Sequence, residues 1–262
     1  MYQVDLSNLE FLQNKLTDVL EGNSFFKVKN GLPFAYPCDN YIETILSIPR
    51  VKRTLESIVN KFYGHQIEGI KKEGIALTCS NYPHLYNTLE ECSQCLNVQV
   101  RPEVILTKRI QGLNALSVGN DSNPMILLSM RSAVSLPEGE LKFLIGHELG
   151  HILQKNMICH TVSGLLLNLK QKSEILGTMI AELIEMPLKE WCRCSEYTAD
   201  RAGLICCKDM EYVYSLMAKV KRYERQSMAP QLMELYKDHP FIDKRLEKLK
   251  AYSNENTELI QI

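Results

Sequence analysis

The segment Phe143–Gln154, FLIGHELGHILQ, constrains this chain more than any other part of it. It places two histidines four residues apart, with a glutamate directly after the first. Residues four apart on a helix share one face, so His147 and His151 can present two imidazoles to one metal ion. An apolar stripe runs along nearly the opposite side, at Leu141, Ile145, Leu149 and Ile152. The segment therefore predicts a helix with a core face and a separate ligand face.

Two glycines, Gly146 and Gly150, lie on a third face of this helix. Glycine has no side chain to hold a neighbour away, so these positions predict close approach by another backbone. Ser135 and Glu138 match a capping box, and Pro137 suits a first helical turn. The helix is expected to run from about Leu136 to Gln154.

A catalytic zinc takes three protein ligands and keeps a position for water. Downstream, SEYTADRAGL places Glu196 and, one turn later, Asp200 on a predicted helix. Glu196 can complete a His-His-Glu ligand set. Glu148 lies about 100° around the helix from His147, which suits a general base acting on the metal's water.

A simpler interpretation exists for each of these groups. The two histidines can share a helix face by chance, and Glu196 with Asp200 can form a solvated acidic face. The carboxylates alone favour the simpler interpretation. Their combination with a histidine pair of metal-ligand spacing favours the metal site.

The fold class predicted from the pattern of elements is α+β, mainly helical. Three short apolar runs, EVILTK, NALSV and MILLS, are separated by turn signals such as GNDSNP and predict three strands beside the metal helix. The turn around Gly119 to Pro124 predicts that the second and third strands pair antiparallel.

Helical spacing of apolar residues surrounds this strand region. It predicts helices in residues 6–20, in NYIETILSIP, in VKRTLESIVNKFYG ending near Gly64, and in PHLYNTLEECSQCLN. A long amphipathic helix is expected over residues 162–184, another helix carries CSEYTADRAGL, and the rest of the chain is helical with a polar tail. Residues 1–80 are expected to form a helical segment packed on a catalytic domain of residues 81–262.

The chain resembles the catalytic domain of zinc endopeptidases of the HtpX and CAAX-prenyl-protease type (peptidase family M48). The matching elements occur in the family's order: RPEVILTK, NALSVG, LKFLIGHELGHIL, SEYTADRAGL and DHPFIDKRL. The likeness covers about His84 to Leu249, whereas the first 80 or so residues match no known pattern. It implies a zincin-type (gluzincin) domain.

The resemblance also implies roles for individual residues. It makes Glu196 the third metal ligand and has Asp200 support the site from behind the ligands. Asn114 and His239 would lie beside the scissile peptide bond, His239 as a donor to the charge that develops on the carbonyl oxygen. Arg245 would brace the Asp200 side.

Many members of this family carry transmembrane helices near or after the metal helix. Here the corresponding stretch contains charged residues, which argue against a membrane span: Lys170, Lys172, Glu174, Glu182 and Glu185. A form without a transmembrane segment is expected. Leu165 to Leu167 are candidates for peripheral contact with a membrane or a partner, although covering the core is the favoured use.

Composition narrows the setting of the protein. The net charge of −1 over 262 residues gives no reason to expect a nucleic-acid partner. The N-terminus lacks a secretory signal pattern, and nine cysteines, an odd count, fit reduced thiols better than a disulfide framework. A cytoplasmic protein is therefore expected.

The cysteines allow one further interpretation. Cys92 and Cys95 form a C-x-x-C pair, and Cys192 and Cys194 a C-x-C pair. Four such cysteines can bind a structural zinc, but C-x-C is a poor match to the usual spacing.

Three functions remain after these arguments. The first is an endopeptidase with one zinc per chain at His147, His151 and Glu196, acting on peptides or unfolded proteins with Glu148 as general base. The second is a catalytically silent scaffold with a metallopeptidase fold. The third is a cysteine-based zinc or redox module. Glu148 favours the first, because a purely structural site needs no base. The substrate is expected to bind as an added strand along the edge near Asn114 to Gly119.

Overall fold

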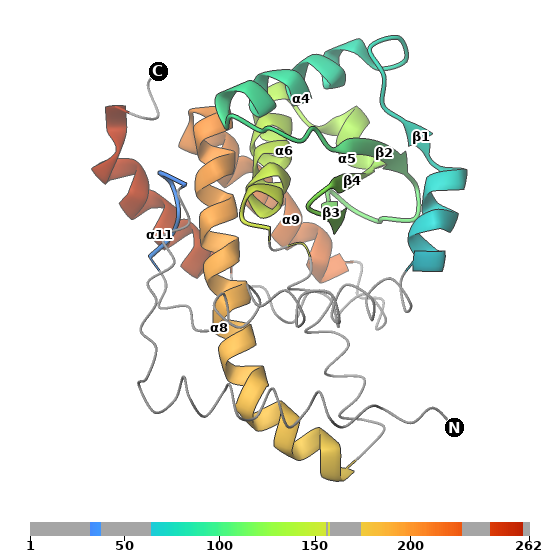
Figure 1. The fold of residues 1–262 in the computed structure, drawn as a ribbon. Coiled ribbons are helices and arrows are strands. Elements are labelled where there is room, and N and C mark those ends of the chain that lie inside the picture. The colour runs from blue at the N-terminus through green and yellow to red at the C-terminus, as the bar shows by residue number, and fades with distance from the viewer. Residues whose placement is uncertain (1–31, 38–63, 156, 158–173, 227–241, 259–262) are drawn as a thin grey trace.

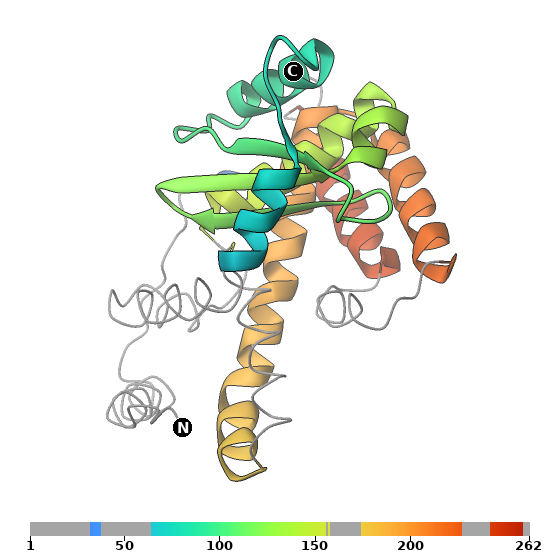
Figure 2. The ribbon, with the colours of Figure 1, turned by 90° about the vertical axis from the view of Figure 1, so that its right-hand side faces the viewer.

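The computed structural model describes residues 32–37, 64–155, 157, 174–226 and 242–258 (Figure 1). A four-stranded sheet and the helix α4 (Pro83–Cys95) lie near the helix α6 (Glu138–Leu153). The helices α8 (Glu174–Cys207) and α11 (Ile242–Glu255) lie on the side of α6 away from the sheet (Figure 2), and α9 (Met210–Gln226) packs against α6 and α11. The predicted α+β class, mainly helical with a small sheet, is confirmed.

The sheet has the strand order β1-β2-β4-β3. The three predicted strands are β2 (Glu103–Thr107), β3 (Ala115–Asn120) and β4 (Asn123–Ser129), and the predicted antiparallel pairing of β3 with β4 is confirmed. β4 pairs parallel with β2, which leaves β3 at the sheet edge beside α6. A fourth strand, β1 (Ile75–Ala76), was not predicted, because two residues carry no periodic signal.

The conformation of the turn between β3 and β4 accounts for the glycine and the asparagine at this point in the sequence. Gly119 has a φ of 102°, and a side chain there would meet the carbonyl oxygen of Asn123 at 2.3 Å. The side-chain oxygen of Asn120 accepts hydrogen bonds from the backbone N–H groups of Ser122 and Asn123, both at 3.0 Å. This local geometry fixes the register of the edge strand.

The helix predicted from about Leu136 to Gln154 is present as α6, with a start two residues later. The metal helix α6 begins at Glu138 after Pro137, and a separate short helix, α5 (Met130–Ser135), precedes it. The capping box was wrong, because the Ser135 hydroxyl donates to the carbonyl of Arg131 instead. The cap that forms is Ser129, whose hydroxyl accepts from the N–H of Ser132 at the start of α5.

The helix carrying CSEYTADRAGL was predicted separately from a helix over residues 162–184. In the structure the two form one helix, α8, from Glu174 onward. Residues 158–173 lie outside the described residues, and so do the helices expected in residues 6–20 and in NYIETILSIP. The PHLYNTLEECSQCLN prediction is confirmed as α4, whereas Gly64 ends no helix, because residues 64–73 are helical.

Small residues let α6 and α8 lie in direct contact, as Gly146 and Gly150 predicted. A side chain on Gly150 would meet the Cα of Ala199 at 2.8 Å, and one on Gly146 would meet the Cys206 sulfur at 2.7 Å. On α8, a side chain at Gly203 would meet the Phe143 carbonyl oxygen at 2.7 Å. This close contact brings a second helix against the histidines.

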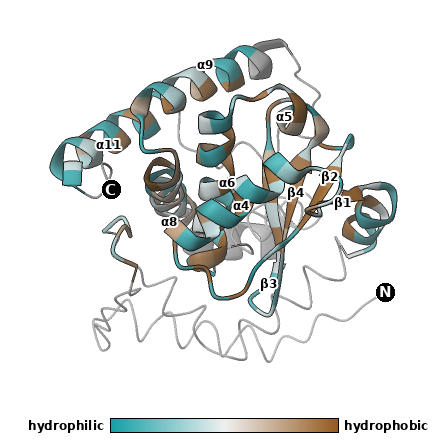
Figure 3. Ribbon diagram, turned by 90° about the horizontal axis from the view of Figure 1, so that it is seen from above, coloured by the Kyte–Doolittle hydropathy of each residue, from teal (hydrophilic) through white to brown (hydrophobic). Residues whose placement is uncertain are grey.

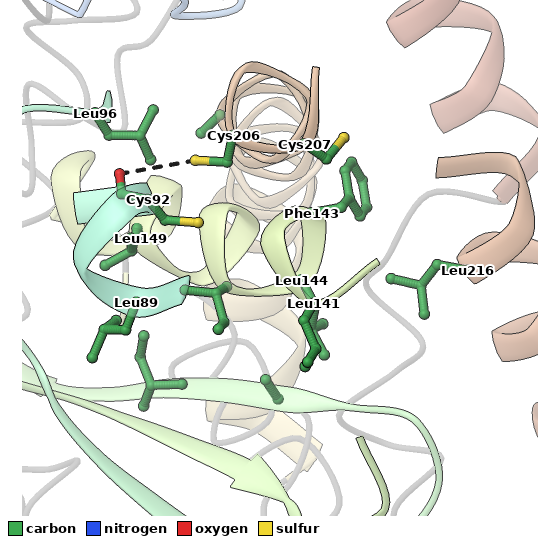
Figure 4. Packing of buried hydrophobic residues seen from close by; sticks show 14 of the residues in the cluster. Leu89, Cys92, Leu96, Leu141, Phe143, Leu144, Leu149, Cys206, Cys207 and Leu216 are labelled. Atoms are coloured by element: carbon green, nitrogen blue, oxygen red, sulfur yellow. Dashed lines mark hydrogen bonds between the residues drawn. The ribbon is translucent and has the colours of Figure 1, made fainter. Parts of the chain in front are cut away.

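The core fills the space between the sheet, α4, α6 and α8 (Figure 3). Figure 4 shows leucines of α4 and α6 packed together above the sheet, with Cys92 and Cys206 at the top of the same cluster. The apolar stripe predicted on α6 is buried at all four of its positions: Leu141, Ile145, Leu149 and Ile152.

A short segment near the N-terminus, residues 32–37, lies against α8. The N–H of Tyr36 donates to the Thr198 hydroxyl at 2.9 Å, and the Arg201 guanidinium donates to the carbonyls of Phe34 and Ala35. The proposed boundary near residue 80 stays a prediction.

Candidate metal centre

His147 and His151 lie one turn apart on α6 and are both buried. Their Nε2 atoms are 3.1 Å apart, with the rings edge to face. Two acceptor nitrogens at this separation in a protein interior need a shared proton or a cation between them. The geometry therefore favours a positively charged ligand at this point.

Glu196 reaches the same point from α8. Its side chain is fully buried, with Oε2 3.7 Å from Nε2 of His147 and Oε1 3.3 Å from Nε2 of His151. Within the described residues, these three side chains are the one group of metal-ligand type whose ligand atoms all lie within 4.8 Å of one another.

The spacing of the ligand atoms is close to that of a tetrahedral zinc site. With bonds of about 2.0–2.2 Å, tetrahedral ligand atoms lie about 3.3–3.6 Å apart. The two Nε2 atoms are 3.1 Å apart, and each lies near one carboxylate oxygen of Glu196, His151 at 3.3 Å from Oε1 and His147 at 3.7 Å from Oε2. Two imidazoles and one carboxylate are also a ligand set that zinc enzymes use, with the fourth position left for water.

Each histidine is held by a partner at its other ring nitrogen. Nδ1 of His147 lies 3.1 Å from Oδ1 of Asp200, and Nδ1 of His151 lies 3.0 Å from the Ser195 hydroxyl. An ionised carboxylate only accepts hydrogen bonds, so His147 carries its proton on Nδ1 and directs the lone pair of Nε2 toward Glu196.

Ser195 was missed by sequence reasoning. It lies directly before Glu196 on α8, and its carbonyl accepts a hydrogen bond from the Gln154 side chain at 3.2 Å. Its one sequence signal is that position beside a ligand, because serines are common and no spacing rule selects this one.

Arg245 comes from α11 and contacts two carboxylates of the site. Its guanidinium donates to both oxygens of Asp200, at 2.8 and 2.5 Å, and lies 3.1 Å from Oε2 of Glu196. Burial alone would raise the pKa of Asp200, but the charge and hydrogen bonds of Arg245 outweigh it and lower that pKa. Asp200 is therefore ionised and able to orient His147.

His151 shows the opposite shift. Burial opposes a charge on its ring, yet the hydrogen bond and charge of Glu196 outweigh burial and raise the pKa of His151. Without a metal, the buried carboxylate thus draws a proton to the place where a cation would lie.

Glu148 lies beside the ligands on α6 and is buried. Its Oε2 accepts a hydrogen bond of 2.7 Å from the backbone N–H of Ser117 on β3. This contact joins the candidate base to the edge strand, and sequence reasoning missed it because it links residues 31 positions apart.

Asn114 precedes β3, where its side-chain oxygen accepts from the N–H of Ala115 at 2.9 Å. Its carbonyl accepts from the N–H of Ser129 at 3.0 Å, which ties it to the end of β4. His239, the other residue expected beside the substrate, lies outside the described residues.

The four-cysteine zinc site considered from the sequence is wrong. Cys192 and Cys194 are disulfide-bonded, so their sulfurs are not free thiolates. This also corrects, at these two positions, the expectation that reduced thiols fit the chain better than disulfides. Free thiols are found at Cys79, Cys92, Cys95, Cys206 and Cys207.

A family profile and a curated relative both connect this chain with peptidase family M48. The sequence profile of peptidase family M48 matches residues 80–253. A chloroplastic plastoglobule-localized metallopeptidase 48 of Arabidopsis thaliana is 26% identical over 198 residues, which are 74% of this chain and 57% of that protein. The chain therefore spans little more than half the length of that relative.

A crystal structure of S. mikatae Ste24p aligns over 91% of this chain and 67% of its own, at 18% identity and a TM-score of 0.41. No helix in the described part of the chain combines the length and apolarity needed to cross a bilayer.

Proposed function

The chain belongs to peptidase family M48, and from this premise we propose that it is a zinc-dependent endopeptidase. The observation that carries the proposal is the buried set of His147, His151 and Glu196, with Glu148 directly beside it. A structural metal site needs no additional buried carboxylate next to its ligands, whereas a hydrolytic site does.

The three ligand residues would hold one zinc per chain. When bound, zinc would acidify a water molecule and polarise the carbonyl of the scissile bond. Asp200 and Ser195 would keep the two imidazoles oriented, and Arg245 would balance the negative charge of Asp200 and Glu196.

Glu148 would act as the general base. Its hydrogen bond to the Ser117 N–H fixes the carboxylate beside the histidines and leaves the second oxygen available for a water proton. The same carboxyl group can then hand that proton to the leaving amine. A neutral amide in its place would keep the shape but not the proton transfer.

The substrate would bind as an added strand along β3. This strand is at the sheet edge, and its outward donor at Ser117 already contacts Glu148. An extended peptide there would lie beside both the base and the metal ligands, using backbone hydrogen bonds with little sequence preference. Peptides or unfolded proteins are therefore the proposed substrates.

Backbone groups alternate in direction along β3, because the Asn114 carbonyl accepts a hydrogen bond from β4 whereas the Ser117 N–H donates to Glu148. The N–H of Leu116 accordingly faces β4, and proline there would break the sheet. Proline at Ser117 would remove the donor that holds Glu148.

Asn114 and His239 keep the roles that the family resemblance gives them, as groups beside the scissile peptide. For His239 this means donation to the oxygen that gains negative charge. A cytoplasmic location also stays a prediction.

The test combines zinc analysis with turnover. Purified protein is expected to contain one zinc per chain and to cleave a library of unstructured peptides. A chelator should abolish cleavage and added zinc should restore it. Glu196→Ala is expected to lose most of the zinc. Equal zinc in both proteins would remove Glu196 from the ligand set, and a zinc-loaded protein inert on all peptides would favour the silent scaffold.

A further inference from the structure

Three thiols gather where the end of α4 meets the end of α8, at the opposite end of the α6–α8 contact from the histidines. Cys92 and Cys95 belong to the last turn of α4, and Cys206 lies one residue before the end of α8. The Cys206 thiol lies 3.9 Å from the Cys92 carbonyl oxygen (Figure 4), and the Cys95 thiol lies 3.6 Å from the carbonyl oxygen of Ile205, the residue directly before Cys206.

The three thiols differ in their access to solvent. Cys95 is exposed, whereas Cys92 and Cys206 are buried. The Cys95 thiol donates to the carbonyl of Ile205 at 3.6 Å, so it lies directly against the end of α8. One exposed thiol therefore lies against the turn of α8 that carries the buried Cys206.

The surroundings favour a thiolate at Cys95. The hydrogen bond from Cys206, aided by the charge of Lys208, outweighs partial burial and lowers the pKa of Cys95 to about 6. The negative end of the α4 dipole opposes this shift but is the weaker influence. Hydrogen bonds to Cys92 and Cys95, with burial, raise the pKa of Cys206, so Cys206 keeps its proton and Cys95 carries the charge.

A soft metal ion is the other occupant that three thiols suggest. In the part of the chain that the structure describes, the His147, His151 and Glu196 group alone brings three ligand atoms within 4.8 Å of one another. The three sulfurs do not meet that distance, so a shared metal ion would need the two helix ends to move. A disulfide joins only two sulfurs, and Cys95 already lies against the residue that precedes Cys206.

We propose that Cys95 and Cys206 are a reversible thiol–disulfide site that low-molecular-weight disulfides oxidise, joining α4 to α8. In the first step the Cys95 thiolate attacks one sulfur of glutathione disulfide, the S–S bond breaks, and one glutathione leaves as thiolate. Cys95 then carries a mixed disulfide.

In the second step the Cys206 sulfur attacks the Cys95 sulfur, the S–S bond between Cys95 and glutathione breaks, and the second glutathione leaves and takes up the Cys206 proton. The balance is two protein thiols oxidised to one disulfide and one glutathione disulfide reduced to two thiols. Capping Cys95 favours this step, because the Cys95 thiolate, whose charge helps to raise the pKa of Cys206, is then gone.

The chain offers matched controls. Cys79 is exposed, as Cys95 is, and its sulfur lies 3.9 Å from the Ser80 hydroxyl. Cys92 lies near Cys206, as Cys95 does, but it is buried and solvent does not reach it. The full chain is treated with glutathione disulfide and examined by intact mass and peptide mapping.

The wild type is expected to gain one internal disulfide between the Cys95 and Cys206 peptides, while any glutathione on Cys79 persists. In Cys206→Ser the glutathione on Cys95 should persist as well, and Cys92→Ser should still form the Cys95–Cys206 bond. A stable glutathione adduct on Cys95 in the wild type, or a Cys92–Cys95 disulfide in its place, would overturn the proposal.

A second measurement does not depend on the variants. Joining residues so far apart in the chain restricts the unfolded state, so the oxidised wild type should melt about 5–10 °C higher than the reduced form. A reductant should reverse the shift. No shift despite a mapped Cys95–Cys206 bond would show that the bond forms in unfolded chains, which also overturns the proposal.

Discussion

The two ends of the α6–α8 contact differ in how they are built. At the metal end, named for His147, His151, Glu196 and Asp200, buried polar groups face one another across the two helices. At the thiol end, named for Cys92, Cys95 and Cys206, the buried Cys92 and Cys206 pack among leucines (Figure 4), and Cys95 is exposed. The thiols come from α4 and α8, so α8 contributes both to a charged site and to a mainly apolar one.

Because of this difference, a substitution should have a different consequence at each end. A buried charge needs a specific partner, and removing the partner leaves the charge uncompensated. A thiol packs as a small apolar group and needs no partner to be buried. Replacements at the metal end should therefore alter metal binding or catalysis, whereas replacements at the thiol end should alter stability and thiol oxidation and leave zinc binding unchanged.

The largest expected effect is at Glu148. Glu148→Gln should keep the fold and the zinc but lower kcat/KM by about 10²–10⁴-fold, because an amide cannot accept the proton of water. Peptide turnover and zinc content are measured together.

Glu140→Gln is the matched control for this change. Glu140 is a buried glutamate on the same helix, but it contacts Ser215 and Lys219 and not the metal ligands. It should lose stability and keep activity. Comparable turnover by wild type and Glu148→Gln would assign the base to another group.

The metal end shows how far sequence reasoning reaches. The spacing of His147, Glu148 and His151 predicted a shared helix face because helix geometry is local. Glu196 was found by chemistry, since a histidine pair calls for a third ligand. The contacts of Ser195 with His151 and of Ser117 with Glu148 were not found, because they arise from how elements distant in the chain pack.

For the fold as well, features with a local sequence signal could be predicted and the others could not. Apolar alternation and turn residues predicted β2, β3 and β4, and the glycines of α6 predicted its close neighbour. The continuity of α8 was missed, since Pro187 stands between the two predicted helices and proline usually ends one. The capping box failed because Ser135 already belongs to α5.

The next effect concerns the residues that orient the ligands. Asp200→Asn should lower zinc affinity by about 10–100-fold, because such outer contacts fix ring orientation and basicity. Ser195→Ala should lower it less, because a hydroxyl gives a weaker, uncharged contact to His151. Competition with a chromophoric chelator measures both. A larger loss in Ser195→Ala than in Asp200→Asn would reverse the assigned importance of the two contacts.

The pH dependence of zinc affinity should differ from the pH dependence of thiol reactivity at Cys95. The pKa of His151 is raised above its usual 6.5, so a proton competes with zinc up to a higher pH than for an ordinary histidine. Affinity should fall at least about tenfold per pH unit below that pKa. Cys95, with its pKa lowered to about 6, should still react near pH 6. Zinc affinity that is constant from about pH 6 to 8 would contradict the competition.

The smallest expected effect is the difference between alanine substitutions at Gly146 and Gly150, the two glycines of α6. Alanine at either position gains about 1 kcal/mol in helix propensity. At Gly150 the new methyl group would meet the Cα of Ala199, so α8 must move, and overpacking costs about 1–3 kcal/mol. At Gly146 the new methyl group would meet the Cys206 sulfur at 2.7 Å, its Cβ at 2.9 Å and the Gly203 Cα at 3.0 Å, so α8 must move there as well.

Both variants should therefore lose stability. Gly150→Ala should also lower zinc affinity, because Gly150 directly precedes His151 and faces the α8 turn next to Glu196, whereas Gly146→Ala should lower it less. Urea unfolding and zinc titration of the two variants decide the matter: equal losses of zinc affinity would mean that the ends of the contact move together.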